Sequence, residues 1–262
     1  MSSPPHPPAG FQRVINLHNT VSEASAALYI PEEHSIWTLG DSGCGTLLGR
    51  TRLHDNETDI IKISGADNID WEAMVTDEDG NIWILDVGDN NATRSNISAY
   101  RITPQFLDDE HVLHTDKNIT ITYADGPRDV EAAACLNERI FLFEKIPLFS
   151  PPHAARVASI DISPGAATRQ ITHSEGTLAI FQPITDASLS PEGHLYLLTY
   201  TGIHISKSWS PTQRSARPLG AFFLGQQESL AALGDNRFII GIESGPVYYK
   251  TFPAHRPHIA FP

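Results

Sequence analysis

Cysteine, basic residues and long apolar runs are all scarce in this chain of 262 residues. Its two cysteines, Cys44 and Cys135, are too few for a disulfide scaffold or a cysteine-rich zinc module. No apolar run reaches membrane-spanning length, and no useful length of sequence has the 3.6-residue period of an amphipathic helix. These absences disfavour membrane-spanning and α/β classes and leave an all-β domain.

Positive charge is in short supply, with 18 Lys and Arg against 31 Asp and Glu, so the formal net charge is −13. Nucleic acids and anionic membranes attract basic surfaces, and we therefore expect neither as a partner. With 40% apolar residues, the chain can bury the core of one domain. We expect a flexible Pro-rich arm over 1–10 and a single monomeric domain over 11–262. The compartment stays open: secreted or periplasmic if residues 1–10 are a trimmed mature start, otherwise cytoplasmic.

A pattern recurs five times: an acid, small and apolar residues, a polar turn and a second β-rich run. Turn residues between two β-rich runs are the signal of a hairpin. The turns are predicted at 31–35, 77–81, 137–139, 191–194 and 234–237. The five copies are SEASAALYIPEEHSIWTLGDSG, WEAMVTDEDGNIWILDVGDN, VEAAACLNERIFLFEK, TDASLSPEGHLYLLTYTG and QESLAALGDNRFIIGIESG.

The spacing of the five acids predicts a closed ring. Successive acids are separated by 49, 59, 55 and 42 residues, and the two ends of the chain supply one further interval of similar size. Repeats of about 40–50 residues with four strands each are typical of propeller blades. We therefore predict a five-bladed β-propeller, with one blade completed by 11–17 and 247–252. The five acids are Glu23, Glu72, Glu131, Asp186 and Glu228.

An acid at the start of every innermost strand would recur around the wall of the central channel. Carboxylates gathered in a partly dry channel repel one another, so they need protons, water or a cation. Oxygen ligands from several strands suit Ca²⁺, whereas zinc would need His and Cys in the same register. We predict a calcium site formed by these five acids. The alternative is that they accept hydrogen bonds from backbone amides between blades, and different acids can serve each role.

Three basic residues are predicted to lie on the same face as the acids. Arg94, Arg128 and Lys145 fall in loops that precede a first strand or follow a second strand. Beside a cation they would hold a small anionic ligand and offset charge on its oxygen atoms. Alternatively they neutralise neighbouring acids.

The motifs around these residues resemble those of a bacterial propeller family. In order they are DWEA (70–73), GDNN with Arg94 (88–94), YADGPRDVEA (123–132), TDASLSP (185–191) and QES (227–229). The resemblance covers roughly residues 20–245 and implies the fold without an activity. A looser similarity of layout links the chain to calcium-dependent propeller hydrolases, namely the calcium-activated nucleotidases and the gluconolactonase and paraoxonase group.

Three functions follow as hypotheses. The first is a calcium-dependent hydrolase of a small anionic ester, lactone or phosphoanhydride, in which Glu72 or Glu131 activates water. The second is a propeller that binds a ligand or protein without catalysis. The third is a metal-dependent lyase or isomerase. Turnover that is lost on chelation separates the enzymes from the binding protein.

Overall fold

The computed structural model describes residues 9–16, 24–207, 209, 215–243 and 245–252, and nearly all of its regular structure is β-strand. Twenty strands form five antiparallel groups of four, which we number as units 1 to 5 from β2 onwards. Unit 1 has β2 (Ala24–Ile30), β3 (Ser35–Gly40), β4 (Leu47–Arg52) and β5 (Thr58–Ser64); unit 2 has β6 (Trp71–Thr76), β7 (Ile82–Asp86), β8 (Ile97–Ile102) and β9 (Val112–Thr122). Unit 3 has β10 (Val130–Leu136), β11 (Arg139–Glu144), β12 (Ala155–Asp161) and β14 (His173–Leu178); unit 4 has β15 (Ile184–Leu189), β16 (Leu195–Thr199), β17 (Gly202–Ser206) and β18 (Arg217–Ala221). Unit 5 has β19 (Gln227–Gly234), β20 (Arg237–Ile242), β21 (Pro246–Thr251) and β1 (Phe11–Asn16).

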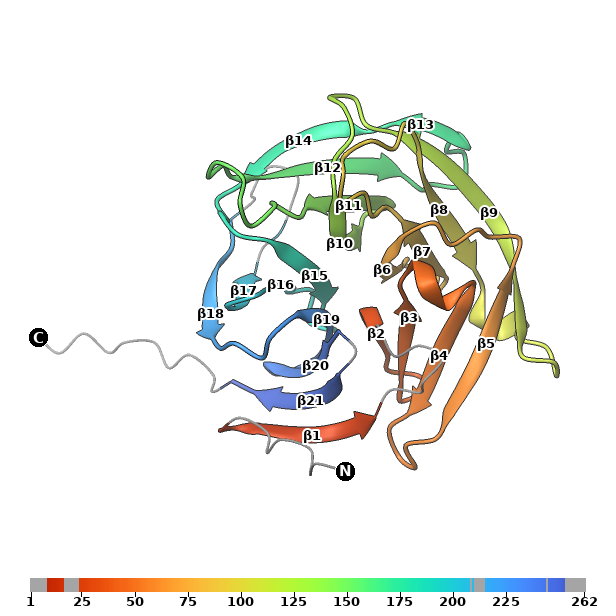
Figure 1. The fold of residues 1–262 in the computed structure, drawn as a ribbon. Helices are drawn as coiled ribbons and strands as arrows, with labels where there is room; N and C mark the ends of the chain where they lie inside the picture. The colour runs from red at the N-terminus through yellow and green to blue at the C-terminus, as the bar shows by residue number, and fades with distance from the viewer. Residues whose placement is uncertain (1–8, 17–23, 208, 210–214, 244, 253–262) are drawn as a thin grey trace, which may run out of the picture.

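The units are arranged around a central axis, with the first strand of each unit innermost (Figure 1). The short β13 (Arg169–Ile171) pairs in parallel with β9, and β5 also pairs in parallel with β9, so units 1 and 2 share one continuous sheet. As the sequence predicted, both ends of the chain meet in one sheet, because β1 pairs with β21. This pairing ties the start of the chain to its end.

Local sequence explains the hairpins within the units. The turn after β10 places Asn137 and Glu138 at φ 51° and 56°, and the turn after β19 places Asp235 and Asn236 at φ 53° and 56°. Two successive residues with positive φ match the right-handed twist of the flanking strands, and Asn and Asp tolerate this conformation. The predicted turns at these positions are confirmed.

The core is divided into five clusters, and each fills the space between two neighbouring units. The smallest joins Ala27 and Ile36 of unit 1 to Ala231, Ile239 and Val247 of unit 5. This contact closes the ring between the first and last repeats. The innermost strands are rich in alanine, which leaves room for them to converge on the axis.

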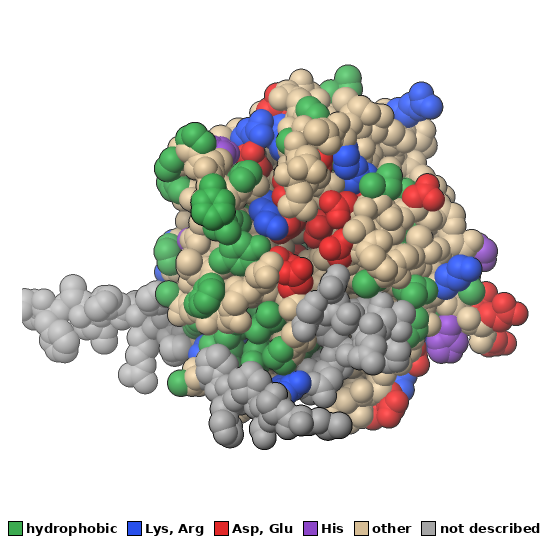
Figure 2. Space-filling view, in the orientation of Figure 1, with side chains coloured by type: hydrophobic (Ala, Val, Ile, Leu, Met, Phe, Trp, Pro, Cys, Tyr) green, Lys and Arg blue, Asp and Glu red, His purple; other side chains and the backbone are tan. Residues whose placement is uncertain are grey.

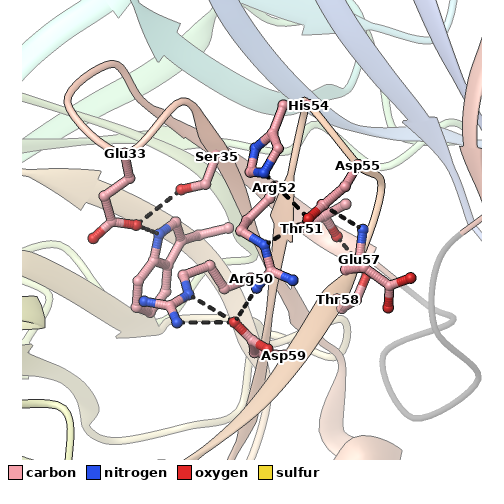
Figure 3. A network of polar contacts seen from close by, with 11 residues as sticks. Glu33, Ser35, Arg50, Thr51, Arg52, His54, Asp55, Glu57, Thr58 and Asp59 are labelled. Carbon is pink, nitrogen blue, oxygen red and sulfur yellow. Dashed lines mark hydrogen bonds and ion pairs between the residues drawn. The ribbon is translucent and has the colours of Figure 1, made fainter.

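A polar network covers the outer part of unit 1 (Figure 3). Arg50 and Arg52 of β4 both donate to Oδ2 of Asp59 on β5, at 2.8 Å each. These ion pairs lie at the surface and are partly exposed, and surface ion pairs contribute about 0–1 kcal/mol each. Their charges are already matched, so we assign this network to the stability of the outer strands. No helix in the described ranges is long and apolar enough to cross a membrane.

Candidate functional site

Each innermost strand has an irregularity in its pairing near its first residue. One residue there has no partner on the second strand of the unit, as in a β-bulge, and bulges commonly redirect a side chain beside a functional site. We call the face on which the innermost strands begin the start face. The five extra residues are Ser25, Glu72, Glu131, Thr185 and Glu228.

Three of the five predicted acids therefore occupy equivalent positions at the channel mouth: Glu72, Glu131 and Glu228. Glu23 lies outside the described residues. Asp186 lies one position beyond the extra residue of unit 4, which is Thr185.

Acidic side chains gather at the centre of the start face, with basic side chains beside them (Figure 2). Carboxylate oxygens of Asp41, Asp70 and Glu72 all lie within 4.8 Å of one another. Asp41 follows β3 of unit 1, whereas Asp70 and Glu72 lie at the start of β6 in unit 2. We call these three residues the acidic cluster, and it is a possible site for a metal ion.

Neighbouring groups hold the acidic cluster together. Asn68 donates from Nδ2 to the backbone oxygens of Gly40 and Asp41, both at 3.2 Å, and accepts from the amide of Trp71 at 3.0 Å. This side chain therefore ties the loop that carries Asp41 to the strand that carries Glu72. The amide of Asp70 donates to Oδ1 of Asp86 at 2.8 Å.

Glycine is required where the loop after β7 passes the cluster. A Cβ on Gly88 would lie 2.8 Å from Cγ of Glu72 and closer still to the carboxylate of Asp70. Any side chain at this position would displace the two acids.

The electrostatics of the cluster favour the binding of a cation. Burial, followed by repulsion from Asp41 and Asp129, raises the pKa of Asp70 to about 6. Burial, followed by Glu131 and Asp70, raises the pKa of Glu72 well above its ordinary value. Charged carboxylates close together in a buried place disfavour ionisation unless a cation offsets them.

Lys145 lies at the same mouth and contacts Glu131. Its Nζ forms an ion pair with Oε1 of Glu131, and the lysine side chain is 17% exposed. Burial alone would lower the pKa of Lys145, but Glu131 raises it above its ordinary value. The other oxygen of Glu131, Oε2, is buried and has no hydrogen-bond partner among the described residues. The lysine is thus held as a cation beside an acceptor oxygen that still lacks a donor.

Tyr200 completes this side of the mouth, and sequence reasoning missed it. Its hydroxyl donates to Oε1 of Glu228 at 3.1 Å, and it follows β16 as Lys145 follows β11. Asp41 follows β3 in the same way. The sequence signal for all three was their position immediately after a second strand.

Asp186 takes the structural role that the sequence left open. Its Oδ2 accepts from the amide of Leu230 at 2.6 Å and from that of Ala27 at 3.5 Å, while Oδ1 accepts from the amide of Ala187 at 2.7 Å. These amides belong to units 5, 1 and 4. The carboxylate therefore links three innermost strands.

Arg94 and Arg128, the other two residues predicted to bind an anion, each form an ion pair with an acid outside the ring of five. Arg94 donates from Nη1 to Oδ1 of Asp86 at 3.0 Å and to the backbone oxygen of Gly88 at 2.7 Å. Arg128 is only 3% exposed, forms an ion pair with Asp125 and lies over the ring of Tyr123 at 4.8 Å. Of the three basic residues, Lys145 is the one that contacts an acid of the ring.

No protein-family model matches this sequence, and no curated protein matches it. Solved structures do resemble the fold. A luciferin-regenerating enzyme is 10% identical with a TM-score of 0.53, and the match covers 92% of this chain and 94% of that one. A gluconolactonase from Xanthomonas campestris is 9% identical with a TM-score of 0.52, covering 93% and 89%.

A virginiamycin B lyase from Staphylococcus aureus is 10% identical with a TM-score of 0.47. The match covers 87% of this chain and 66% of the lyase, so the chain spans slightly less than two thirds of that protein. The gluconolactonase and the luciferin-regenerating enzyme are propellers of the six-bladed type, and the chain shares the β-propeller fold with them. At this level of identity the likeness concerns the fold alone.

Proposed function

We propose that this protein is a hydrolase that depends on a divalent cation, most suitably calcium, and acts on a small anionic ester, lactone or phosphoanhydride at the channel mouth. The observation that carries the proposal is the convergence of Asp41, Asp70 and Glu72 within 4.8 Å, beside the ion pair of Lys145 and Glu131. Hydrolases among the structural neighbours are consistent with it.

The donor set suits a hard cation. Three carboxylates supply oxygen ligands and negative charge, and no His or Cys belongs to the group. Calcium accepts six to eight oxygens, so three carboxylates leave positions for substrate and water. When bound, the cation would act as a Lewis acid on a carbonyl or phosphoryl oxygen. Asp186 is left out of the ligand set because both of its oxygens already accept amide hydrogens.

Glu131 is the general base that we propose. Burial raises its pKa well above the ordinary value, and Lys145 offsets part of that increase. A carboxylate with a raised pKa removes a proton from water more effectively near neutral pH. Glu72 is the weaker candidate, because its oxygen belongs to the acidic cluster.

Lys145 is the anion-binding residue that we propose. Its ammonium group is held at the mouth by Glu131 and stays charged, so it can bind a carboxylate or phosphate group of the substrate. Arg94 and Arg128 would act from further away, through the loops that they stabilise. We also propose that units 1 to 5 are the blades of a five-bladed propeller and that the chain acts as a monomer.

Metal content and turnover test the proposal together. The purified protein would be stripped with a chelator, titrated with Ca²⁺ and screened against a small aryl ester, an aldonolactone and inorganic pyrophosphate. We expect turnover that requires Ca²⁺ and falls 100-fold or more in Glu131→Gln. Glu78→Gln, an exposed acid on the opposite face, is the matched control and should be fully active. Binding of these compounds without turnover would favour the non-catalytic alternative.

A further inference from the structure

Large apolar side chains are exposed around one side of the channel mouth. Among the described residues, seven large hydrophobic side chains are more than 60% exposed. Four of the seven lie in three loops of units 3 to 5 on the start face, and we call them the apolar rim. The rim consists of Leu148 (65% exposed), Phe149 (100%), Phe181 (63%) and Phe223 (72%). Figure 2 shows hydrophobic side chains massed on one side of the central acids.

Each of the three loops packs one apolar residue against the core and exposes the ones that follow. Ile146 and Ile180 are 3% and 2% exposed and belong to the core between units 3 and 4. Phe222 packs against Phe11 with ring centroids 5.3 Å apart. The residues that follow these anchors are the rim residues. The loops are therefore fixed to the core, and the exposed side chains are held in place.

The tip of the first loop is a turn whose two central residues are exposed. The amide of Ser150 donates to the backbone oxygen of Pro147 at 3.0 Å, which places Leu148 and Phe149 at the two central positions. Pro147 restricts the backbone at the start of this turn. A single exposed apolar side chain is ordinary on a protein surface, whereas several of them grouped beside polar residues are typical of a binding surface.

The rim residues lie only a few positions along the sequence from residues at the channel mouth. Leu148 comes three residues after Lys145, Phe181 three residues before the first residue of β15, and Phe223 four residues before the first residue of β19. Thr201, next to Tyr200, donates to Oε1 of Gln182 at 2.6 Å and so joins the loop of Phe181 to the mouth. A cation and an apolar surface therefore border the same opening.

We infer that the substrate is an amphiphile, with an anionic or carbonyl head group at Lys145 and the acidic cluster and an alkyl or aryl chain of several carbons on the apolar rim. This inference rests on the proposed function for its head-group site and adds the chemical class of the remainder of the substrate. Burying each methylene group on the rim strengthens binding about fourfold.

Binding of two sulfonates that differ only in chain length tests the inference without any need for turnover. Ethanesulfonate and octane-1-sulfonate would be titrated calorimetrically into the whole protein with Ca²⁺ present. We expect octane-1-sulfonate to bind at least 100-fold more tightly. The double variant Leu148→Ser/Phe149→Ser should lose tenfold or more of the affinity for octane-1-sulfonate and less than twofold for ethanesulfonate. Phe106→Ser, 76% exposed on the opposite face, is the matched control and should change neither.

The outcomes separate this inference from the proposed function. Equal affinities for both sulfonates, or binding of neither, would overturn the inference. So would a chain-length preference that survives in the double variant, or affinities for both sulfonates that are unaffected by Lys145→Ala. A self-associated wild type that becomes monomeric in the double variant would identify a second copy as the occupant and would also overturn it. Chain-length and Lys145 dependence without any effect of Ca²⁺ would support the amphiphile while the metal-dependent hydrolase fails.

Discussion

At the scale of single residues, the acids of the channel are of two kinds, which differ in the groups that surround each carboxylate. The carboxylates of the acidic cluster lie close to one another. Burial is the main cause of the raised pKa values of Asp70, Glu72 and Glu131. Burial also raises the pKa of Asp186, but its carboxylate accepts hydrogen bonds from three backbone amides. The first kind is suited to binding a cation, and the second holds strands together.

The raised pKa of Asp70 predicts how pH acts on the metal-free protein. In the folded state Asp70 keeps its proton up to about pH 6, whereas its ordinary pKa is 3.8. Between these values the unfolded chain binds fewer protons at this residue, so its contribution to the unfolding free energy falls as pH rises. We expect Asp70→Asn to become progressively more stable than wild type between pH 4 and pH 6. Urea unfolding followed by tryptophan fluorescence measures this difference.

Calcium supplies the control for that prediction. A ligand that binds only the native state stabilises it by mass action. With saturating Ca²⁺ at pH 7, the order should reverse, because Asp70→Asn lacks one ligand of the proposed site. An unchanged difference between the two proteins from pH 4 to pH 6 would contradict the raised pKa.

Asp186→Ala should affect stability and leave the metal site intact. It removes the acceptor for three amides in a buried place, and each buried group left without a partner costs about 1–3 kcal/mol. We expect a loss of about 3 kcal/mol or more in chemical denaturation, with an unchanged Ca²⁺ affinity for the protein that remains folded. Asp186→Asn retains one acceptor oxygen and should lose less. A variant that is as stable as wild type but binds Ca²⁺ weakly would return Asp186 to the metal site.

At the scale of elements, the start of each innermost strand and the loop after each second strand form the site together. The extra residue of the innermost strand is Glu72 in unit 2, Glu131 in unit 3 and Glu228 in unit 5. The first residue after the second strand is Asp41 in unit 1, Lys145 in unit 3 and Tyr200 in unit 4. Loops on a rigid scaffold are the usual carriers of function, because they vary without disturbing the sheets.

Gly88→Ala tests whether the loop after β7 positions the acids. Its Cβ would meet the side chains of Asp70 and Glu72, so the acids should separate. We expect the Ca²⁺ affinity to fall tenfold or more while most of the thermal stability is retained. The matched control is Gly43→Ala in the loop after β3, where an added Cβ has no described atom within 4 Å. Competition with a fluorescent chelator measures both, and equal affinities in the two variants would contradict the positioning role.

At the scale of the whole molecule, the ring is held closed by one strand from the start of the chain. β1 pairs with β21 and contributes Phe11 to the core between units 4 and 5. β1 covers the edge of β21 and becomes the outer strand of this sheet, and propellers keep such remaining edges short.

Deleting residues 1–16 should therefore weaken the whole fold. We expect a melting temperature lower by about 5 °C or more, since the loss of a strand and of Phe11 removes several kcal/mol. Deleting residues 1–8 alone gives the baseline, because it leaves β1 in place. Equal melting temperatures for the two truncations, measured by circular dichroism, would show that β1 does not hold the ring closed.

Local patterns in the sequence determined the strands, the hairpin turns and the pairing of the two ends of the chain. Turn residues and alternation act over a few neighbouring residues, so they can be seen in one sequence. The same patterns predicted Glu72, Glu131 and Glu228 at the channel mouth, because each repeats at the start of an innermost strand. Asp186 was placed in the same set because its spacing fits, although Thr185 holds the equivalent position.

Only the tertiary structure decided which groups converge. Asp41 and Asp70 come from different units and meet because the ring curves and Asn68 joins their loops. The burial of Arg128 over Tyr123 likewise depends on packing that its neighbours in sequence do not reveal. A one-residue change of register turns a side chain to the other face of a strand, and that register is set across the whole sheet. Spacing alone therefore identifies the acids, and the ring decides whether they bind a cation or a backbone amide.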